Sequence, residues 1–255
     1  MDAILKVTTE MVLPVLKEWD AVYAVVMLRF GSDRYDPSFF ISYDVYYNGP
    51  IPGREVREAA FPFAAGFETT RDEQKDRFLI DDVPVRLEYK DQHAFDSVLE
   101  TVFGNCDGGF PESTYGFYRL KKGELIYSRG DWVDRTRQML NEIPDSFWDR
   151  RVQALRARMD HVLTDLSSAV YSGEVLFYTL SLASFLNTLS ALLFAINRRF
   201  EPAGRILNEQ LRQLPVLPEE FDTRLEYLLR SDSVVTDKRK REIAELVTWS
   251  VLRLL

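Results

Sequence analysis

The chain has 255 residues, of which 46% are apolar and 28% are charged, enough to bury one large core or two smaller ones. A formal net charge of -8 argues against an extended nucleic-acid surface, which would need clustered lysine and arginine. The single cysteine, Cys106, excludes an internal disulfide, and the first residues lack a secretory pattern. We therefore expect a cytoplasmic protein with no membrane partner.

The first half of the sequence predicts strands mixed with helices. Apolar residues at helical spacing predict helices, and β-branched and aromatic runs bounded by turn residues predict strands. The predicted elements, in chain order, are a helix at 9–19, strands at 22–30 and 39–47, a helix at 53–60, a hairpin of strands 77–80 and 83–89, and a helix at 91–102.

The second half is predicted to be almost entirely helical. A glycine-rich region at 104–130, with a short strand at 124–127, links it to the first half. The predicted helices are at 132–143, 144–171, 174–200, 202–213, 218–229 and 236–255. We therefore expect an α+β fold, with a mixed sheet and helices at 1–125 and an all-α helical bundle domain at 126–255.

Residues 175–196 carry no charge and are long enough to cross a bilayer. Polar residues recur at three- and four-residue spacing from Glu174 through Ser181 to Thr188, so they form one stripe on a helix. This stripe is typical of a central bundle helix that faces a cleft on one side. We therefore favour a bundle helix rather than a membrane-spanning one. Glu174 itself is either a general base or, as a residue at a helix start, a partner of the helix dipole.

One group of residues is arranged for phosphate and metal chemistry. Gly31-Ser32 follows the first predicted strand and can offer backbone N–H groups to phosphate oxygens. Ser42 and Asp44 lie two residues apart in the second strand and so point to the same face. Glu88, in the strand 83–89, is a candidate for a further carboxylate at the same place. Carboxylates that hold a divalent metal over a triphosphate would suit this arrangement.

This pattern resembles the nucleotidyltransferase superfamily, whose hallmark is Gly-Ser, then Asp-x-Asp, then a third acid on an adjacent strand. The resemblance implies that Gly31, Ser32 and Ser42 bind nucleotide and that Asp44 and Glu88 are catalytic and hold Mg²⁺ or Mn²⁺. The chain departs from the pattern at Ser42, where the superfamily has its first aspartate. A serine hydroxyl is a weak, neutral ligand, so a two-metal site should lose most of its affinity for one ion.

The helical region at 163–229 resembles the second domain of small antibiotic-modifying nucleotidyltransferases and their uncharacterised relatives. The resemblance implies metal-dependent transfer of a nucleoside monophosphate from a nucleoside triphosphate to a hydroxyl of an unknown small-molecule or protein acceptor. The alternative, favoured by Ser42, is a catalytically degenerate fold that binds a nucleotide or a protein. A third possibility is a helical interaction protein with an unrelated α/β head.

Two weaker patterns stay open beside this one. Arg156 and His161 resemble the catalytic pair of HEPN-type ribonucleases, although chance easily gives such a spacing. Arg77 and Arg86, on the predicted hairpin, either steady a triphosphate or solvate the sheet edge.

Overall fold

The computed structural model describes residues 2–31, 36, 39–104, 111–231 and 234–255, and these form two compact units. The N-terminal unit comprises Met1–Gly109 with Arg119–Ile143, and the helical unit comprises Phe110–Tyr118 with Pro144–Leu255. The predicted boundary after residue 125 stays a prediction of domain organisation.

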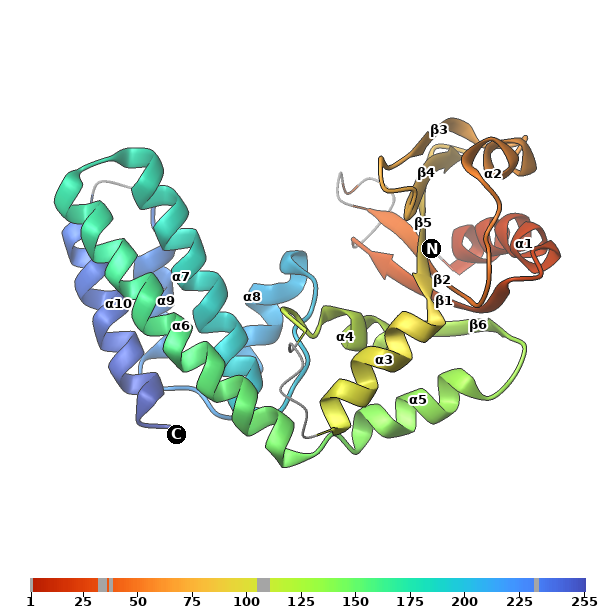
Figure 1. The fold of residues 1–255 in the computed structure, drawn as a ribbon. Coiled ribbons are helices and arrows are strands. Elements are labelled where there is room, and N and C mark those ends of the chain that lie inside the picture. The colour runs from red at the N-terminus through yellow and green to blue at the C-terminus, as the bar shows by residue number, and fades with distance from the viewer. Residues whose placement is uncertain (1, 32–35, 37–38, 105–110, 232–233) are drawn as a thin grey trace. The chain divides into compact units, whose positions relative to one another are not determined.

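The N-terminal unit combines strands and helices (Figure 1). Its elements are α1 (Asp2–Glu18), β1 (Val22–Phe30), β2 (Phe40–Tyr47), α2 (Arg54–Ala60), β3 (Ala65–Thr69), β4 (Lys75–Ile80), β5 (Val83–Asp91), α3 (Gln92–Phe103), β6 (Glu124–Ser128) and α5 (Trp132–Asn141). Helix α4 (Tyr115–Lys122) begins in the part of the chain that belongs to the helical unit and ends in the N-terminal unit.

The strands form one mixed six-stranded sheet in the order β3-β4-β5-β2-β1-β6. Only β2 and β5 pair in parallel among these neighbours, and their register sets Asp44 beside Glu88. Strands β4 and β5 form the predicted hairpin, whose turn residues Asp81 and Asp82 both have positive φ, at 47° and 62°. Two positive φ values are what a tight two-residue turn requires.

One face of the sheet carries the main hydrophobic core. Alternate residues of β2 and β5, such as Tyr43 and Leu87, pack there with Val12 and Leu16 of α1. A buried ion pair holds α2 over the same region, with Arg57 Nε 2.9 Å from Asp76 Oδ2. The predicted α+β fold is confirmed.

The opposite face of the sheet is covered in part by α3 and α5. Tyr46 of β2 lies 5.8 Å from the Phe95 ring and 5.0 Å from the Trp132 ring, measured between ring centroids. Trp132 donates a hydrogen bond from Nε1 to Asp96 of α3 over 2.8 Å. These aromatic contacts fix β2 against the helices, so the even-numbered side chains of β2 are buried on this face.

The helical unit contains α6 (Asp145–Ser172), α7 (Val175–Ile196), α8 (Gly204–Arg212), α9 (Phe221–Leu229) and α10 (Asp237–Leu252). The segment before α4 is tied to it by Glu201, whose carboxylate accepts a hydrogen bond from Thr114 N over 2.9 Å and another from Arg151 Nη2 over 2.7 Å. Phe117 adds an edge-on contact with Phe200 at 5.5 Å.

Helix α7 begins immediately after the turn that ends α6. Gly173 closes α6 in the left-handed conformation, and the Glu174 carboxylate accepts hydrogen bonds from the backbone N–H groups of Leu176 and Phe177. Glu174 is therefore an N-cap. The expectation of a stripe facing a cleft is wrong, because Ser181 and Thr188 are only 4% and 3% exposed. Helix α7 is long and apolar enough to cross a membrane, but half of its most apolar window is buried inside the protein.

Most predicted elements match observed ones. Two observed elements were not predicted, strand β3 and helix α4. Helix α4 lies inside the region interpreted as a glycine-rich linker, and it contributes the side chain that defines the candidate site.

Candidate functional site

Gly31 directly follows β1 and has a backbone conformation that few other residues adopt. Its φ is +90°, and a Cβ at this position would lie 2.7 Å from Phe39 Cα. Glycine is therefore required both by the backbone and by the close approach of the next strand. Ser32, the other half of the predicted phosphate-binding turn, lies outside the described residues.

The sheet brings Ser42, Asp44 and Glu88 onto one face. Ser42 and Asp44 are fully buried, and Glu88 is directly beside Asp44 across the parallel β2–β5 pair. The period of two along a strand explains why Ser42 and Asp44 share a face. The predicted geometry of these three residues is thus observed, whereas their catalytic, nucleotide-binding and metal-binding roles stay predictions.

Arg119 of α4 lies between the two carboxylates. Its Nε donates to both oxygens of Asp44, over 3.1 Å to Oδ1 and 2.8 Å to Oδ2. Its Nη2 donates to Ser42 Oγ over 2.8 Å and also contacts Asp44 Oδ1. Its Nη1 is 3.5 Å from Glu88 Oε1. One guanidinium, itself 2% exposed, therefore joins all three predicted residues of the two strands.

Two lysines complete the charge balance. Lys90 Nζ donates to Asp44 Oδ2 over 2.7 Å, and Lys75 Nζ is 3.8 Å from Glu88 Oε2. Burial lowers the pKa of Lys90 below its usual value, an effect that the negative charge of Asp44 opposes. Each oxygen of the two carboxylates therefore faces a lysine or arginine nitrogen of the chain itself.

The two carboxylates as arranged do not form a metal site. A divalent ion needs carboxylate oxygens that converge on a common point, and at Asp44 and Glu88 the guanidinium of Arg119 is at that point. Among the described residues, no group of three or more His, Cys, Asp or Glu side chains is arranged to hold a metal ion. The serine at position 42 is part of this arrangement, since its hydroxyl accepts a hydrogen bond from the same guanidinium.

Other side chains on this face of the sheet add a cation and a buried hydroxyl. The guanidinium carbon of Arg86 lies 3.7 Å above the centroid of the Phe40 ring, which in turn stacks on Phe30 at 4.7 Å. The Tyr46 hydroxyl is buried and has no hydrogen-bond partner among the described residues. Burial, together with the negative charge of Asp44, raises the pKa of Tyr46 well above its usual value.

Sequence reasoning missed Arg119 because it missed α4. The available signals were Ser113-Thr114 as start residues, Lys121-Lys122 in the last turn and Gly123 directly after it. Gly123 also explains how the helix reaches the sheet, since a Cβ there would lie 2.2 Å from the Val26 side chain of β1. The end of α4 therefore lies close to β1, where Arg119 can reach Asp44.

Two other sequence candidates, Arg156 and His161, belong to the helical unit. His161 Nε2 is 3.6 Å from Asp165 Oδ2, with the histidine side chain 76% exposed, and Arg156 is also exposed. Cys106 lies outside the described residues.

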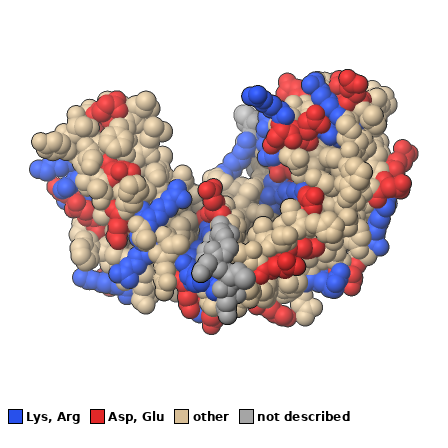
Figure 2. Space-filling view, in the orientation of Figure 1, with Lys and Arg blue, Asp and Glu red and all other residues tan. Residues whose placement is uncertain are grey.

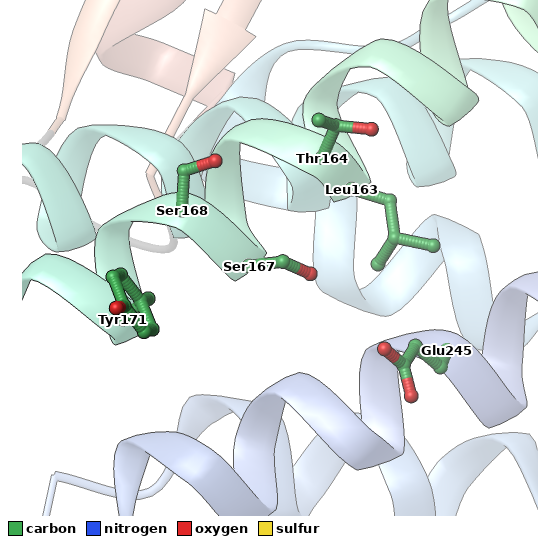
Figure 3. A pocket seen from close by; sticks show the side chains of 6 residues that line it. All are labelled: Leu163, Thr164, Ser167, Ser168, Tyr171 and Glu245. Carbon is green, nitrogen blue, oxygen red and sulfur yellow. The ribbon is translucent and has the colours of Figure 1, made fainter.

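A hollow of about 460 Å³ lies between α6 and α10 in the helical unit (Figure 3), but it contains none of the predicted residues. No lysine or arginine of the described residues lines it, so it offers no cation to a phosphate. Its lining residues are Leu163, Thr164, Ser167, Ser168, Tyr171 and Glu245.

Comparison with known proteins supports the fold. No protein-family model matches the chain, and no curated protein does. Among solved structures, a nucleotidyltransferase-like protein from Exiguobacterium sibiricum matches with a TM-score of 0.51 and 12% sequence identity, over 96% of this chain and 73% of that chain. At this identity the likeness shows the fold alone. The nucleotidyltransferase-like fold expected from Gly31, Asp44 and Glu88 is confirmed.

Proposed function

We propose that this chain is a nucleotidyltransferase-fold protein that binds a nucleotide without a metal ion and does not transfer it. The observation that carries the proposal is the position of Arg119, whose guanidinium pairs with Asp44 and Glu88 where the fold's carboxylates would hold metal. A neutral Ser42 in place of an acid fits the same role.

The charge on this face of the sheet supports binding of an anion. In the two-metal arrangement of the fold, three carboxylates and two divalent ions leave about one positive charge in excess. Here Lys75, Arg86, Lys90 and Arg119 outnumber Asp44 and Glu88 by two positive charges. A polyphosphate would therefore meet a net positive charge without any metal. Arginine suits this task because it is always charged and presents several donors.

The absence of transfer follows from the same residues. In-line displacement at phosphorus needs a group that activates the attacking hydroxyl and a cation that stabilises the leaving pyrophosphate. Both carboxylate oxygens of Asp44 accept hydrogen bonds from Arg119 or Lys90, so neither is open to a substrate hydroxyl. Arg119 would instead hold Asp44 and Glu88 in place and neutralise them beneath the bound phosphates.

A second candidate function is metal-dependent transfer of a nucleoside monophosphate to a hydroxyl acceptor. The register that sets Asp44 beside Glu88 favours it. It requires Arg119 to leave both carboxylates when substrate and metal arrive, so that one ion can be held between them.

Calorimetric titration with ATP, GTP, CTP and UTP, in EDTA and in Mg²⁺, tests the proposal. We expect one or more nucleotides to bind equally well in both buffers, with no pyrophosphate released over hours. Binding that requires Mg²⁺, with pyrophosphate released, would establish the second candidate instead. If none of the four nucleotides binds in either buffer, the proposal is wrong, and a protein partner is the next class of ligand to test.

Two variants locate the binding. Arg119→Met should weaken nucleotide binding in EDTA and create a response of the unfolding midpoint to Mn²⁺, because it frees Asp44 and Glu88. Arg57→Met is the matched control: it removes a buried arginine from a carboxylate, Asp76, on the core side of the sheet. The control should lose stability but change neither nucleotide binding nor the Mn²⁺ response.

A further inference from the structure

Strand β4 has one buried face and one exposed face. Asp76, Phe78 and Ile80 are all buried on the core side of the sheet. The side chains between them point to the opposite side, where Arg77 and Leu79 are exposed. This half of the sheet therefore presents an open face on the same side as the candidate site.

Arg77 of β4 lies directly opposite Arg86 of β5. The two residues are register partners in the antiparallel β4–β5 pair, so their side chains share one face of the sheet. Residues paired in this way have Cβ atoms about 5 Å apart, and like charges at such positions are destabilising. Neither strand is an edge strand, because β4 also pairs with β3 and β5 also pairs with β2. The protection of a sheet edge therefore does not account for the two arginines.

The surroundings of the pair add positive charge and hold one of its members in place. Lys75 lies two residues before Arg77 on the same face of β4, and its side chain is 43% exposed. The Phe40 ring supports the guanidinium of Arg86 at 3.7 Å from its centroid. Glu68 of β3 is the register partner of Arg77 on the other side, but no ion pair joins these two residues. In the space-filling view, lysine and arginine side chains lie on the exposed surface around β3 and β4 (Figure 2).

We propose that Arg77 and Arg86 together bind the terminal phosphate of a polyphosphate chain. Two guanidinium groups side by side offer several N–H donors, and their planar shape matches the oxygens of a phosphate. A phosphate between them would replace the repulsion within the pair by an attraction to both members. The inference rests on the proposed function for the molecule that carries the chain, a nucleoside triphosphate.

The position of the pair sets the direction of the phosphate chain. Ser42 of β2 lies beside Arg86 in the parallel β2–β5 pair, and its hydroxyl accepts a hydrogen bond from Arg119. Adjacent strands are about 4.8 Å apart, so Arg77 lies about 10 Å across the sheet from Ser42. The chain would therefore run from the neutralised carboxylates across β5 towards β4, and its last phosphate would reach the arginine pair.

Calorimetric titration with inorganic tripolyphosphate, in EDTA and about 0.15 M salt, tests the pair without a base or a sugar. We expect Arg77→Gln to weaken tripolyphosphate binding at least about 10-fold, because hydrogen bonds from a charged donor are lost. Arg77 is exposed, so the variant should keep its fold, and without an anion it should be at least as stable as the original chain. Arg54→Gln is the matched control and should leave the affinity unchanged, since it removes an exposed arginine from α2, on the core side of the sheet.

The mono-, di- and triphosphates of one nucleoside separate this inference from the proposed function. We expect Arg77→Gln to weaken binding of the triphosphate and to leave binding of the monophosphate unchanged. Nucleoside triphosphates that bind equally well to this variant would overturn the inference and leave the proposed function intact. Tripolyphosphate that binds through Arg77 while no nucleotide binds would overturn the proposed function alone. Failure of tripolyphosphate to bind, or an equal loss in Arg77→Gln and Arg54→Gln, would overturn the arginine pair as a phosphate site.

Discussion

Replacing Arg119 with methionine should destabilise the N-terminal unit by about 3 kcal/mol. Removing one partner of a buried ion pair typically costs 3–5 kcal/mol, because the other charge stays buried without compensation. Asp44 is fully buried, but Lys90 stays 2.7 Å from its Oδ2 and offsets part of the loss. The hydrogen bond to Ser42 is lost too. We therefore place the expected loss at the lower end of that range.

Urea unfolding followed by tryptophan fluorescence measures this loss in the relevant unit. Trp19 and Trp132 lie in the N-terminal unit, and Trp148 and Trp249 in the helical unit. A background in which Trp148 and Trp249 are phenylalanine restricts the signal to the N-terminal unit. Arg135→Met is the control, since the Arg135 side chain is 66% exposed and pairs with the exposed Asp131 one turn away. It should change the free energy of unfolding by less than about 0.5 kcal/mol.

A double-variant cycle shows whether the loss comes from the ion pair. Arg119→Met with Asp44→Asn removes both charges, and replacing both partners of a buried pair is often close to neutral. We expect the double variant to recover about 2 kcal/mol relative to the sum of the two single changes. Additive losses, or a cost below about 1 kcal/mol for Arg119→Met alone, would refute the ion pair as the element that holds this site.

Three further predictions concern neighbouring residues. Gly31→Ala should lower the free energy of unfolding more than Gly49→Ala. Both glycines have positive φ, but only a Cβ at position 31 would meet the backbone of Phe39. Equal losses of unfolding free energy in urea would contradict this. Tyr46→Phe should stabilise the protein by about 1 kcal/mol, since it removes a buried hydroxyl without a partner among the described residues; a destabilised variant would reveal a bond to that hydroxyl. The lowered pKa of Lys90 means that the unfolded chain binds this proton more tightly than the folded chain. The free energy of unfolding should therefore rise with pH from the folded pKa of Lys90 up to 10.5, and a Lys90→Arg variant that keeps the same slope would contradict this.

Local periodicity predicted most of the fold. The strands that carry Asp44 and Glu88 were predicted from apolar runs and turn residues, and the period of two placed Ser42 and Asp44 on one face. Whether Glu88 would lie beside Asp44 depended on the pairing of β2 with β5, which the resemblance to nucleotidyltransferases supplied. These parts were accessible because each depends on neighbours in sequence or on a known topology.

The contact that defines the site was not accessible in this way. Arg119 lies 75 positions after Asp44, on a helix of only eight residues. A short helix gives a weak periodic signal, and the chain contains many arginines with nothing local to single out this one. The prediction that the polar stripe of α7 faces a cleft was wrong for another reason. Serine and threonine hydroxyls can donate to a carbonyl one turn back, as buried Thr248 does to Ala244, so such residues do not mark an exposed face.

Ser42 and Arg119 depend on each other in this arrangement. An aspartate at position 42 would place three carboxylates around a single guanidinium, with Lys90 already bonded to Asp44. The added charge would share that guanidinium with two other carboxylates and so be buried without full compensation, which costs several kcal/mol. Conversely, a serine at position 42 without Arg119 would leave Asp44 and Glu88 side by side, where like charges disfavour ionisation of both. The serine at the position of the first acid is therefore matched by Arg119, which lies outside the sequence motif. With both residues present, the positive charge between Asp44 and Glu88 comes from a side chain of the protein.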